Sequence, residues 1–297
     1  MKSGFITVVG KPNAGKSTLV NALVGEKVAI VSWRPQTTRN KITGIMHGDG
    51  YQAIFLDTPG LHTAKNHLGD YMMKSVKSAL NDVDAVCYVV NAEKGMDDYD
   101  ADYIQKSVKS GTKTLVVVNK IDAVAPENVL AVLAKLTEIE GLYSVVPVSA
   151  KRGDAVDELR DVIVKMLPEG EEYYPDDVFT ERSVRFMAAE IIREKALKLL
   201  DKEIPYGIGV YVNKFETRPD GLVTDVDADI ICEKQSHKAI IIGKKGEMLK
   251  RIATEARKDI EEMLDGKVYL TLWVRVKEEW RDSDFMLKEL GYDSTDL

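Results

Sequence analysis

The residues Gly10–Ser17 have the composition and spacing of a phosphate-binding loop. Their sequence is Gly-Lys-Pro-Asn-Ala-Gly-Lys-Ser, and it lies between an apolar run and a segment with helical apolar spacing. In such a loop the backbone wraps the phosphates, N–H groups at the start of the helix point at them, Lys16 supplies positive charge and the Ser17 hydroxyl reaches Mg²⁺. The residues predicted to surround the phosphates are Gly10, Lys11, Pro12, Asn13, Ala14, Gly15, Lys16 and Ser17.

A second motif, Asn119-Lys120-Ile121-Asp122, predicts which base is bound. The Asp122 carboxylate can accept hydrogen bonds from guanine N1–H and from the exocyclic amine, two donors that adenine does not offer in that arrangement. A site with such an acceptor rejects the wrong base, because its polar groups would be left unpaired. The backbone of Ser149-Ala150-Lys151 is predicted to close over the base. The sequence therefore predicts a guanine nucleotide, GTP or GDP.

Asp57-Thr58-Pro59-Gly60 follows the apolar run 52–56 and supplies further groups of a nucleotide switch. The Asp57 carboxylate is predicted to bind the metal, and the Gly60 amide is predicted to lie near the γ-phosphate. Gln36-Thr37-Thr38-Arg39 offers a second hydroxyl for Mg²⁺; Thr38 is favoured and Thr37 is the second choice. The predicted metal ligands are Ser17, Thr38 and Asp57, the predicted catalytic groups are Lys16, Thr38 and Gly60, and Thr58, Pro59 and Leu61 complete the predicted nucleotide-binding set.

Leu61 is unusual for a hydrolytic switch, because many such proteins carry a water-orienting glutamine at this place. Our hypothesis is that hydrolysis relies on Lys16, Mg²⁺ and backbone amides, is slow in the isolated protein and needs a partner or a cation. His62 is the alternative group for positioning water, although it lies one residue further along the chain.

The elements that must position these groups are predicted from apolar runs. The segments 4–10, 52–56, 114–118 and 145–148 are apolar along their length, as in parallel sheets covered by helices on both faces, and 17–24 has helical spacing. We therefore expect an α/β fold in which residues 1–168 form a P-loop GTPase domain with a doubly wound, mostly parallel sheet. The nucleotide should lie at the carboxyl ends of the strands.

A second domain is expected after a stretch rich in proline, glycine and acidic residues, which places a linker at 169–179. The later segments predict a helix at 181–203, strands at 207–217 and 221–232, a helix at 236–242, the loop Gly243-Lys244-Lys245-Gly246, a helix ending at 264 and a strand at 267–276. This order is that of an α+β, type II KH domain, a module that binds RNA. Residues 180–297 are therefore expected to be a KH domain with a C-terminal helix.

The charge of the chain does not by itself indicate a nucleic-acid binder. The net charge is −7, and the part from Phe179 onward holds 21 basic against 24 acidic residues. The segment 234–258, however, holds eight basic residues and two acidic ones, a net of +6 around the glycine loop. The predicted RNA-binding residues are Gly243, Lys244, Lys245, Gly246, Lys250 and Arg251; an ordinary solvated helix face is the alternative.

Several classes of protein are disfavoured. No apolar stretch reaches the roughly 20 residues of a membrane span and the N-terminus enters a strand almost at once, so we expect a cytosolic protein without a signal peptide or transmembrane segment. Cys87 and Cys232 lack paired spacing and are interpreted as reduced packing residues. A P-loop kinase of metabolites would have no use for Asn119–Asp122, and a pure RNA-binding protein would not need the first domain.

Together, the motifs Gly-x-Pro-Asn-x-Gly-Lys-Ser, Gln-Thr-Thr-Arg, Asp-Thr-Pro-Gly-Leu-His, Asn-Lys-Ile-Asp and Gly-Lys-Lys-Gly resemble those of Era-type GTPases, a bacterial family with a GTPase domain and a C-terminal KH domain. The resemblance covers essentially the whole chain. One departure is Arg34, where the family pattern has lysine.

The resemblance implies binding near the 3′ end of small-subunit ribosomal RNA and a role in assembling the 30S subunit from its pre-30S particle. It also implies peripheral contact with the inner face of the cell membrane. Asn13 suggests K⁺ as a second cation, because related GTPases with asparagine at this position use it to hold an activating K⁺; an asparagine that only braces the loop is the alternative. A GTPase that serves RNA modification or membrane-linked cell-cycle signalling, with a different target, is the alternative function.

Overall fold

The computed structural model describes residues 1–293, and the chain divides into two compact units. The first unit comprises 1–31, 38–63 and 72–181, and the second comprises 32–37, 64–71 and the chain from Arg182 onward. The second unit therefore contains two short segments from the first quarter of the sequence. The last four residues of the predicted KH domain, 294–297, lie outside the described residues.

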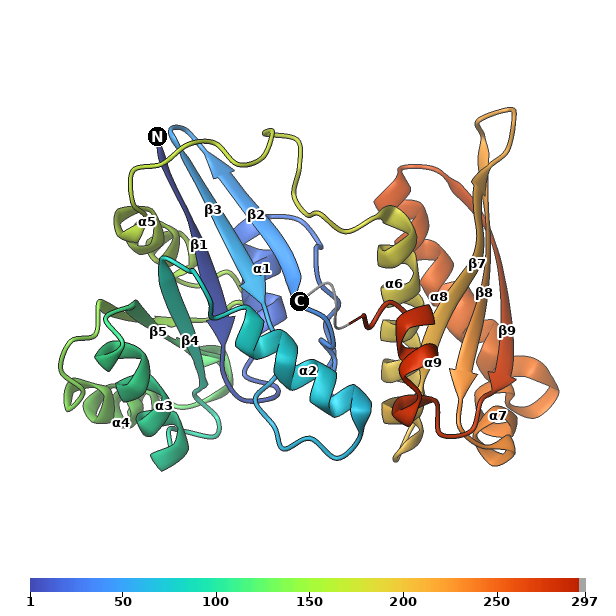
Figure 1. The fold of residues 1–297 in the computed structure, drawn as a ribbon, viewed down its shortest axis with the longest axis horizontal. Helices are drawn as coiled ribbons and strands as arrows, with labels where there is room; N and C mark the ends of the chain where they lie inside the picture. Colours follow the sequence, from blue (N-terminus) through green and yellow to red (C-terminus); the bar gives the residue numbers. More distant parts are fainter. Residues whose placement is uncertain (294–297) are drawn as a thin grey trace. The chain divides into compact units, whose positions relative to one another are not determined.

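The first unit is built on a six-stranded sheet in the order β2-β3-β1-β4-β5-β6 (Figure 1). Its strands are β1 (Lys2–Val9), β2 (Ile42–Gly48), β3 (Tyr51–Asp57), β4 (Ala85–Asn91), β5 (Lys113–Asn119) and β6 (Ser144–Val148). All neighbours pair in parallel except β2 and β3, which are antiparallel. The expected doubly wound, mostly parallel sheet is confirmed, and the antiparallel edge strand β2 is an addition that the sequence analysis did not name.

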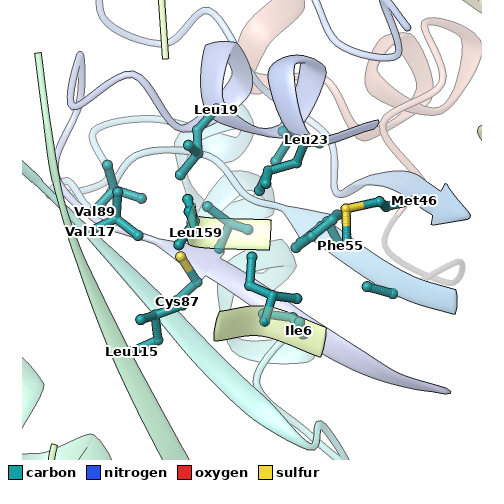
Figure 2. Packing of buried hydrophobic residues seen from close by; sticks show 14 of the residues in the cluster. Ile6, Leu19, Leu23, Met46, Phe55, Cys87, Val89, Leu115, Val117 and Leu159 are labelled. Atoms are coloured by element: carbon teal, nitrogen blue, oxygen red, sulfur yellow. The ribbon is translucent and has the colours of Figure 1, made fainter. Parts of the chain in front are cut away.

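Helices cover both faces of this sheet. They are α1 (Lys16–Val24), α2 (His67–Ser78, in this unit from Met72 on), α3 (Asp98–Lys109), α4 (Pro126–Thr137) and α5 (Val156–Met166). Residues of α1 and α5 pack on one face with alternate residues of the strands, and residues of α2, α3 and α4 pack on the other. Figure 2 shows Leu19 and Leu23 of α1 and Leu159 of α5 among Ile6, Cys87 and Val117 of the strands. Burial of both sheet faces explains why the strands are apolar along their length.

Residues 169–179, predicted to be a linker, contain no helix or extended strand and lie along the outer strands of the first unit. The Gln52 side chain donates to the carbonyl of Tyr174 at 2.7 Å, and Ile45 N–H donates to the carbonyl of Phe179 at 2.9 Å. These bonds satisfy backbone groups that a free segment would leave to water. The compact unit consequently runs to Glu181, whereas the predicted domain ended at 168.

The second unit contains a three-stranded sheet in the order β7-β8-β9. Its elements are α6 (Val184–Leu199), η2 (Ile204–Gly207), β7 (Gly209–Thr217), β8 (Val223–Cys232), α7 (Gln235–Ile242), η3 (Lys244–Gly246), α8 (Glu247–Leu264), β9 (Lys267–Val276), η4 (Trp280–Asp282) and α9 (Asp284–Glu289). β7 and β8 are antiparallel, and β8 and β9 are parallel. This order and pairing confirm a type II KH fold with a C-terminal helix.

One helix boundary differs from the prediction of a helix over 181–203. Helix α6 begins at Val184, because the Ser183 hydroxyl caps it by accepting from the Phe186 N–H, and it ends at Leu199, before the extended Leu200. Residues 200–203, which the prediction included in the helix, instead connect α6 to the short turn η2, which contains Pro205.

Two further sequence expectations can be compared with the described residues. Cys87 and Cys232 are both free and buried, as expected of packing residues. Among residues 1–293, no helix combines the length and the apolar character needed to cross a bilayer.

Candidate functional site

The phosphate loop connects the end of β1 to the start of α1, and Gly15 in this loop leaves no room for a side chain. Gly15 has φ +91°, and a Cβ there would lie 2.3 Å from the Asn119 side-chain nitrogen. Asn13 also has a positive φ, +64°. Because α1 begins directly after Gly15, its first N–H groups face the space that the loop surrounds.

Lys16 is held at the centre of this loop. Its side chain is buried, and its Nζ donates to the carbonyls of Gly10 at 3.1 Å and of Lys11 at 3.3 Å. Burial lowers the pKa of the Lys16 ammonium to about 8, against the opposing effect of the Asp57 charge. A phosphate oxygen at this position would favour the charged form of the lysine.

The three predicted metal ligands lie together. Ser17 Oγ lies 2.6 Å from an oxygen of Asp57 and 2.8 Å from the Thr38 hydroxyl, and Thr38 Oγ1 lies 3.4 Å from that same Asp57 oxygen. Thr37, the second choice, instead donates its hydroxyl to the carbonyl of Arg34 at 2.7 Å. The structure therefore brings Thr38, and not Thr37, to Ser17 and Asp57.

This cluster fits Mg²⁺. Asp57 is fully buried, and its Oδ1 has no hydrogen-bond partner in the part of the chain that the structure describes. Burial raises the pKa of Asp57 to about 6, against the lowering effects of Lys16 and of the Ser17 and Thr38 hydroxyls. A buried carboxylate beside two hydroxyls is a set of hard oxygen ligands, which is what Mg²⁺ prefers.

The segment after Asp57 is bound to the phosphate loop. A Cβ on Gly60 would lie 2.8 Å from Pro12 Cα, so only glycine permits this approach. Leu61 N–H donates to the carbonyl of Gly10 at 3.3 Å, and Thr58 Oγ1 donates to the carbonyl of Val8 at 2.8 Å. These contacts place Gly60 beside the phosphate loop, and its predicted proximity to a γ-phosphate stays a prediction.

Leu61 and His62 have different surroundings. The Leu61 side chain is buried in the core cluster that contains Val9 and Tyr88, so it contributes packing and no polar group. His62 Nδ1 lies 2.9 Å from the carbonyl of Gly60, and its Nε2 is buried without a hydrogen-bond partner among the described residues.

Asn119 connects the base-recognition motif to the phosphate loop. Its side-chain nitrogen donates to the carbonyl of Ala14 at 3.0 Å, and its side-chain oxygen accepts from the Ala150 N–H at 3.1 Å. The chain after β5 and the chain after β6 are thereby fixed beside the loop.

The Asp122 carboxylate is oriented by Ser149. The Ser149 hydroxyl donates to Asp122 at 2.7 Å, and this hydrogen bond is the largest of the effects that keep the pKa of Asp122 below its usual range. The carboxylate is therefore ionised at neutral pH and can accept from two donors of a base. Ser149 was predicted to contribute its backbone, and the structure adds the hydrogen bond from its hydroxyl to Asp122.

Two other residues of these motifs make no such contact in the described structure. Ile121 begins the short turn η1 (Ile121–Ala123), and Lys151 is exposed.

Sequence reasoning missed the residues that surround the start of α3. Lys120 pairs with Glu93 at 3.1 Å. Lys11 pairs with Asp97 and Asp100, and these two aspartates also form the capping box of α3. The spacing of Asp97 and Asp100 before a helix was the signal that could have found them.

The loop Gly243–Gly246 in the second unit has the backbone that its glycines suggest. Gly243 has φ +74° and ψ 176°, and a Cβ there would lie 2.7 Å from the Met248 Cβ. Gly246 has φ +80° with open space around it. The four predicted basic RNA-binding side chains are all exposed: Lys244, Lys245, Lys250 and Arg251. Arg251 also pairs with Glu255 at 3.3 Å.

Comparisons with known proteins show the family to which the chain belongs. A family model described as 50S ribosome-binding GTPase matches residues 5–120, and a KH domain model matches residues 203–281. The GTPase Era of Clostridium kluyveri is 49% identical over 292 residues, which are 98% of this chain and 99% of that protein. The chain belongs to the Era GTPase family. It is therefore a GTPase that carries a KH domain.

Two solved Era structures match nearly the whole chain. One is Era in complex with MgGDPNP and nucleotides 1506–1542 of 16S ribosomal RNA, with a TM-score of 0.93 and 39% identity over 98% of this chain and 99% of that one. The other is an alanine variant of Aquifex aeolicus Era bound to GDP and AlF₄⁻, with the same TM-score, identity and coverage. A guanine nucleotide is bound in both Era structures, and Mg²⁺ is named in the first.

Proposed function

We propose that this Era-family GTPase binds small-subunit ribosomal RNA near its 3′ end and assists assembly of the 30S subunit from the pre-30S particle. The observation that carries the proposal is the Gly243–Gly246 loop, where two positive-φ glycines flank two exposed lysines at the start of α8. Such a loop lets a sugar-phosphate backbone approach closely. The Era structure with a 16S ribosomal RNA fragment, which matches 98% of this chain, favours the small subunit, although the family model matching residues 5–120 names the large one.

GTP hydrolysis would use groups that converge at the end of β1. Ser17, Thr38 and Asp57 would hold Mg²⁺, which neutralises charge on the phosphate oxygens when bound. Lys16 holds its ammonium among the carbonyls of the loop and would transfer its hydrogen bonds to the phosphates. The Gly60 amide would donate to the γ-phosphate and so report whether it is present.

Because Leu61 is buried and apolar, the water must be oriented by another group, and we propose that hydrolysis is slow in isolation and is stimulated by K⁺ at Asn13. The residue type and place of Asn13 support this, because it brings a side-chain amide oxygen, a ligand suited to K⁺, into the predicted phosphate loop. Turnover of GTP in KCl and in NaCl of equal ionic strength tests the idea. A faster reaction in KCl that Asn13→Ala abolishes is expected, and equal rates in both salts would eliminate the K⁺ site.

The proposal includes a cytoplasmic location with peripheral contact at the inner face of the cell membrane. The resemblance of the motifs to Era-type GTPases supports this contact. Co-sedimentation of the intact protein with vesicles containing anionic lipid tests it: recovery in the pellet at physiological salt is expected. Recovery only in the supernatant would remove membrane contact from the function.

RNA binding should depend on salt. If Lys244, Lys245, Lys250 and Arg251 neutralise about four phosphates, the log–log dependence of affinity on salt has a slope of roughly −3 on single strands. A flat dependence would argue against a phosphate-binding loop.

The deciding experiment is binding of a labelled single-stranded oligonucleotide of the small-subunit rRNA 3′ end, measured with GDP and with a non-hydrolysable GTP analogue. The variant Gly246→Asp adds a negative charge to the loop, and Gly246→Asn is its matched control, since asparagine tolerates the positive φ. Tighter binding with the analogue, retained in Gly246→Asn and lost in Gly246→Asp, is expected. Absent or nucleotide-independent binding would leave a GTPase whose target lies in RNA modification or membrane-linked signalling.

A further inference from the structure

The side chain of Lys11, in the phosphate loop, is bound by two carboxylates at the start of helix α3. Its Nζ donates to Asp97 and, at 3.0 Å, to Asp100. The same ammonium lies 5.6 Å from the centre of the Tyr99 ring, within the range of a cation–π contact. All of these residues belong to the first unit. The positive charge of Lys11 therefore has its partners on α3.

Asp100 is the fixed member of this cluster. Only 4% of its side chain is exposed. Its Oδ1 accepts from the Tyr88 hydroxyl at 2.7 Å, and its Oδ2 accepts from the Asp97 N–H at 3.0 Å as well as from Lys11. A buried carboxylate requires such partners, because a buried charge left unpaired is costly. Asp100 is therefore the stronger anchor for Lys11, and the exposed Asp97 is the weaker one.

The backbone of Lys11 belongs to the turn of the phosphate loop. Its carbonyl accepts from the Lys16 Nζ and from the Ala14 N–H, each at 3.3 Å. Directly before it, Gly10 lies so close to β4 that a Cβ would be 2.4 Å from the Val89 carbonyl oxygen. Lys11 thus joins two structures: its backbone shapes the loop, and its side chain is fixed to α3.

The segment between β4 and α3 contacts the loop a second time. Asn91, the last residue of β4, donates from its side-chain nitrogen to the carbonyl of Asn13 at 3.4 Å. Its side-chain oxygen accepts from the Glu93 N–H at 2.8 Å. A loop that is already held in its binding conformation loses less conformational freedom when a ligand binds, and it therefore binds more tightly.

We propose that Lys11 and Asp100 are positioning residues for nucleotide binding: their ion pair holds the phosphate loop against α3 and so slows the release of GDP and GTP. This inference rests on the proposed binding of the phosphates by Gly10–Ser17. Neither side chain contacts the nucleotide in this scheme. Lys11 acts through the loop backbone that it carries, and Asp100 acts through Lys11.

The test measures dissociation of fluorescent GDP from the full chain after addition of excess unlabelled GDP. Lys11→Met removes the charge and keeps a long side chain, Lys11→Arg keeps the charge, and Asp100→Asn keeps the shape of the carboxylate without its charge. Asp102→Asn is the matched control, because Asp102 lies on the same helix and pairs with the exposed Lys106 at 2.7 Å. Hydrolysis in a single turnover at saturating GTP and the thermal unfolding midpoint are measured for each variant.

We expect Lys11→Met and Asp100→Asn each to speed GDP dissociation by about tenfold, as for the loss of a hydrogen bond between charged groups. The double variant should release GDP no faster than either single variant, because both changes remove the same pair. Lys11→Arg and Asp102→Asn should stay within about twofold of the wild type. The single-turnover rate should also change less than about twofold, because neither residue touches the reacting atoms.

A direct contact between Lys11 and a phosphate predicts the opposite result for Asp100→Asn. The ammonium freed from Asp100 would then bind the phosphate more strongly, and GDP release would be unchanged or slower. That result would overturn the proposal, and so would additive effects in the double variant. Lowered unfolding midpoints with wild-type dissociation would show that the pair only stabilises the fold, which would overturn it as well.

Lys16→Ala separates this inference from the proposal on which it rests. If Lys16→Ala keeps the wild-type affinity for GDP, Gly10–Ser17 does not bind the phosphates and the positioning role is wrong with it. If Lys16→Ala loses affinity for GDP while Lys11→Met and Asp100→Asn release GDP at the wild-type rate, the phosphate loop stands and only the further inference is overturned.

Discussion

The side-chain nitrogen of Asn119 lies 3.0 Å from the carbonyl oxygen of Ala14, although 105 residues separate them. The same side chain accepts from the Ala150 N–H, so one amide joins the phosphate loop, the base-recognition motif and the segment expected to close over the base. The motifs predicted to bind the phosphates and the base are therefore joined by hydrogen bonds of one side chain.

Replacing Asn119 with aspartate should weaken GDP and GTP binding alike. The substitution removes the donor to Ala14 and places a negative charge against its carbonyl, so a loss of roughly 10- to 100-fold in affinity is expected. The affinities can be measured by titration with fluorescent GDP and a GTP analogue. Asn128→Asp, at an exposed position on α4, is the control and should have no effect. A loss confined to one of the two nucleotides would contradict the joining role of Asn119.

Asp122→Asn should change which base is bound. An amide nitrogen in place of a carboxylate oxygen faces the donors of guanine, so GDP affinity should fall at least about 100-fold. A xanthine nucleotide has an oxygen in place of the amine, so its affinity should rise.

Ser149→Ala keeps the Asp122 carboxylate and removes only the hydrogen bond that orients it. This change should weaken GDP binding by about 1 kcal/mol, or roughly fivefold in affinity, without changing the preference for guanine. Dissociation constants for GDP, xanthosine diphosphate and ADP test both. Uniform changes across the three nucleotides would refute the assignment.

The pair Lys11 and Asp97 should make stability depend on pH in the acid range. The hydrogen bond from Lys11, followed by that from the Asp100 N–H, lowers the pKa of Asp97 from 3.8 to about 2. A carboxylate whose pKa is lower in the folded than in the unfolded chain stabilises the fold at pH values above its unfolded-state pKa. The contribution of Asp97 is therefore present above about pH 4 and is lost as the pH falls toward 2. Because the Asp97 side chain is 63% exposed, the contribution should stay below about 1 kcal/mol.

Thermal unfolding of the wild type and Asp97→Asn between pH 6 and pH 2.5 measures this contribution. The difference between their midpoints should shrink as the pH falls. Asp98→Asn removes a carboxylate from the same helical turn that is not bonded to Lys11 in the described structure, and it serves as the control. A difference for Asp97→Asn that is constant with pH would show that the ion pair with Lys11 is not the cause.

Alanine at the two glycines of the KH loop should have unequal effects on stability. Gly243 combines φ +74° with ψ 176°, a region essentially restricted to glycine, and its added Cβ would meet Met248 at 2.7 Å. Gly243→Ala should therefore cost about 2–4 kcal/mol from strain and overpacking together. Gly246 lies in the left-handed region with open space, so Gly246→Ala should cost only about 1 kcal/mol. Urea unfolding of the full chain, followed through the transition of the second unit, measures the loss of unfolding free energy in each variant. Equal losses in the two variants would contradict this geometry.

The sequence by itself predicted the chemistry of a nucleotide site and determined both fold classes. Gly10–Ser17 is one contiguous loop, so its amides, lysine and hydroxyl are recognisable from spacing alone. The apolar strands and the helix-loop-helix around Gly243–Gly246 depend on local periodicity, and their bounds agree with the observed elements to within a few residues. The charge around this loop, but not its energetic role, was equally visible in the sequence.

Tertiary structure alone decided which of two adjacent threonines lies beside Ser17 and Asp57. Thr37 and Thr38 are chemically identical, and only the folded chain shows that the Thr38 hydroxyl reaches Ser17 and Asp57, whereas the Thr37 hydroxyl donates to the carbonyl of Arg34. The bond from Asn119 to Ala14 and the pairing of Lys11 with Asp97 were hidden for the same reason. Each joins residues far apart in the chain, and no local spacing or periodicity encodes such a contact, because it exists only after the strands have assembled.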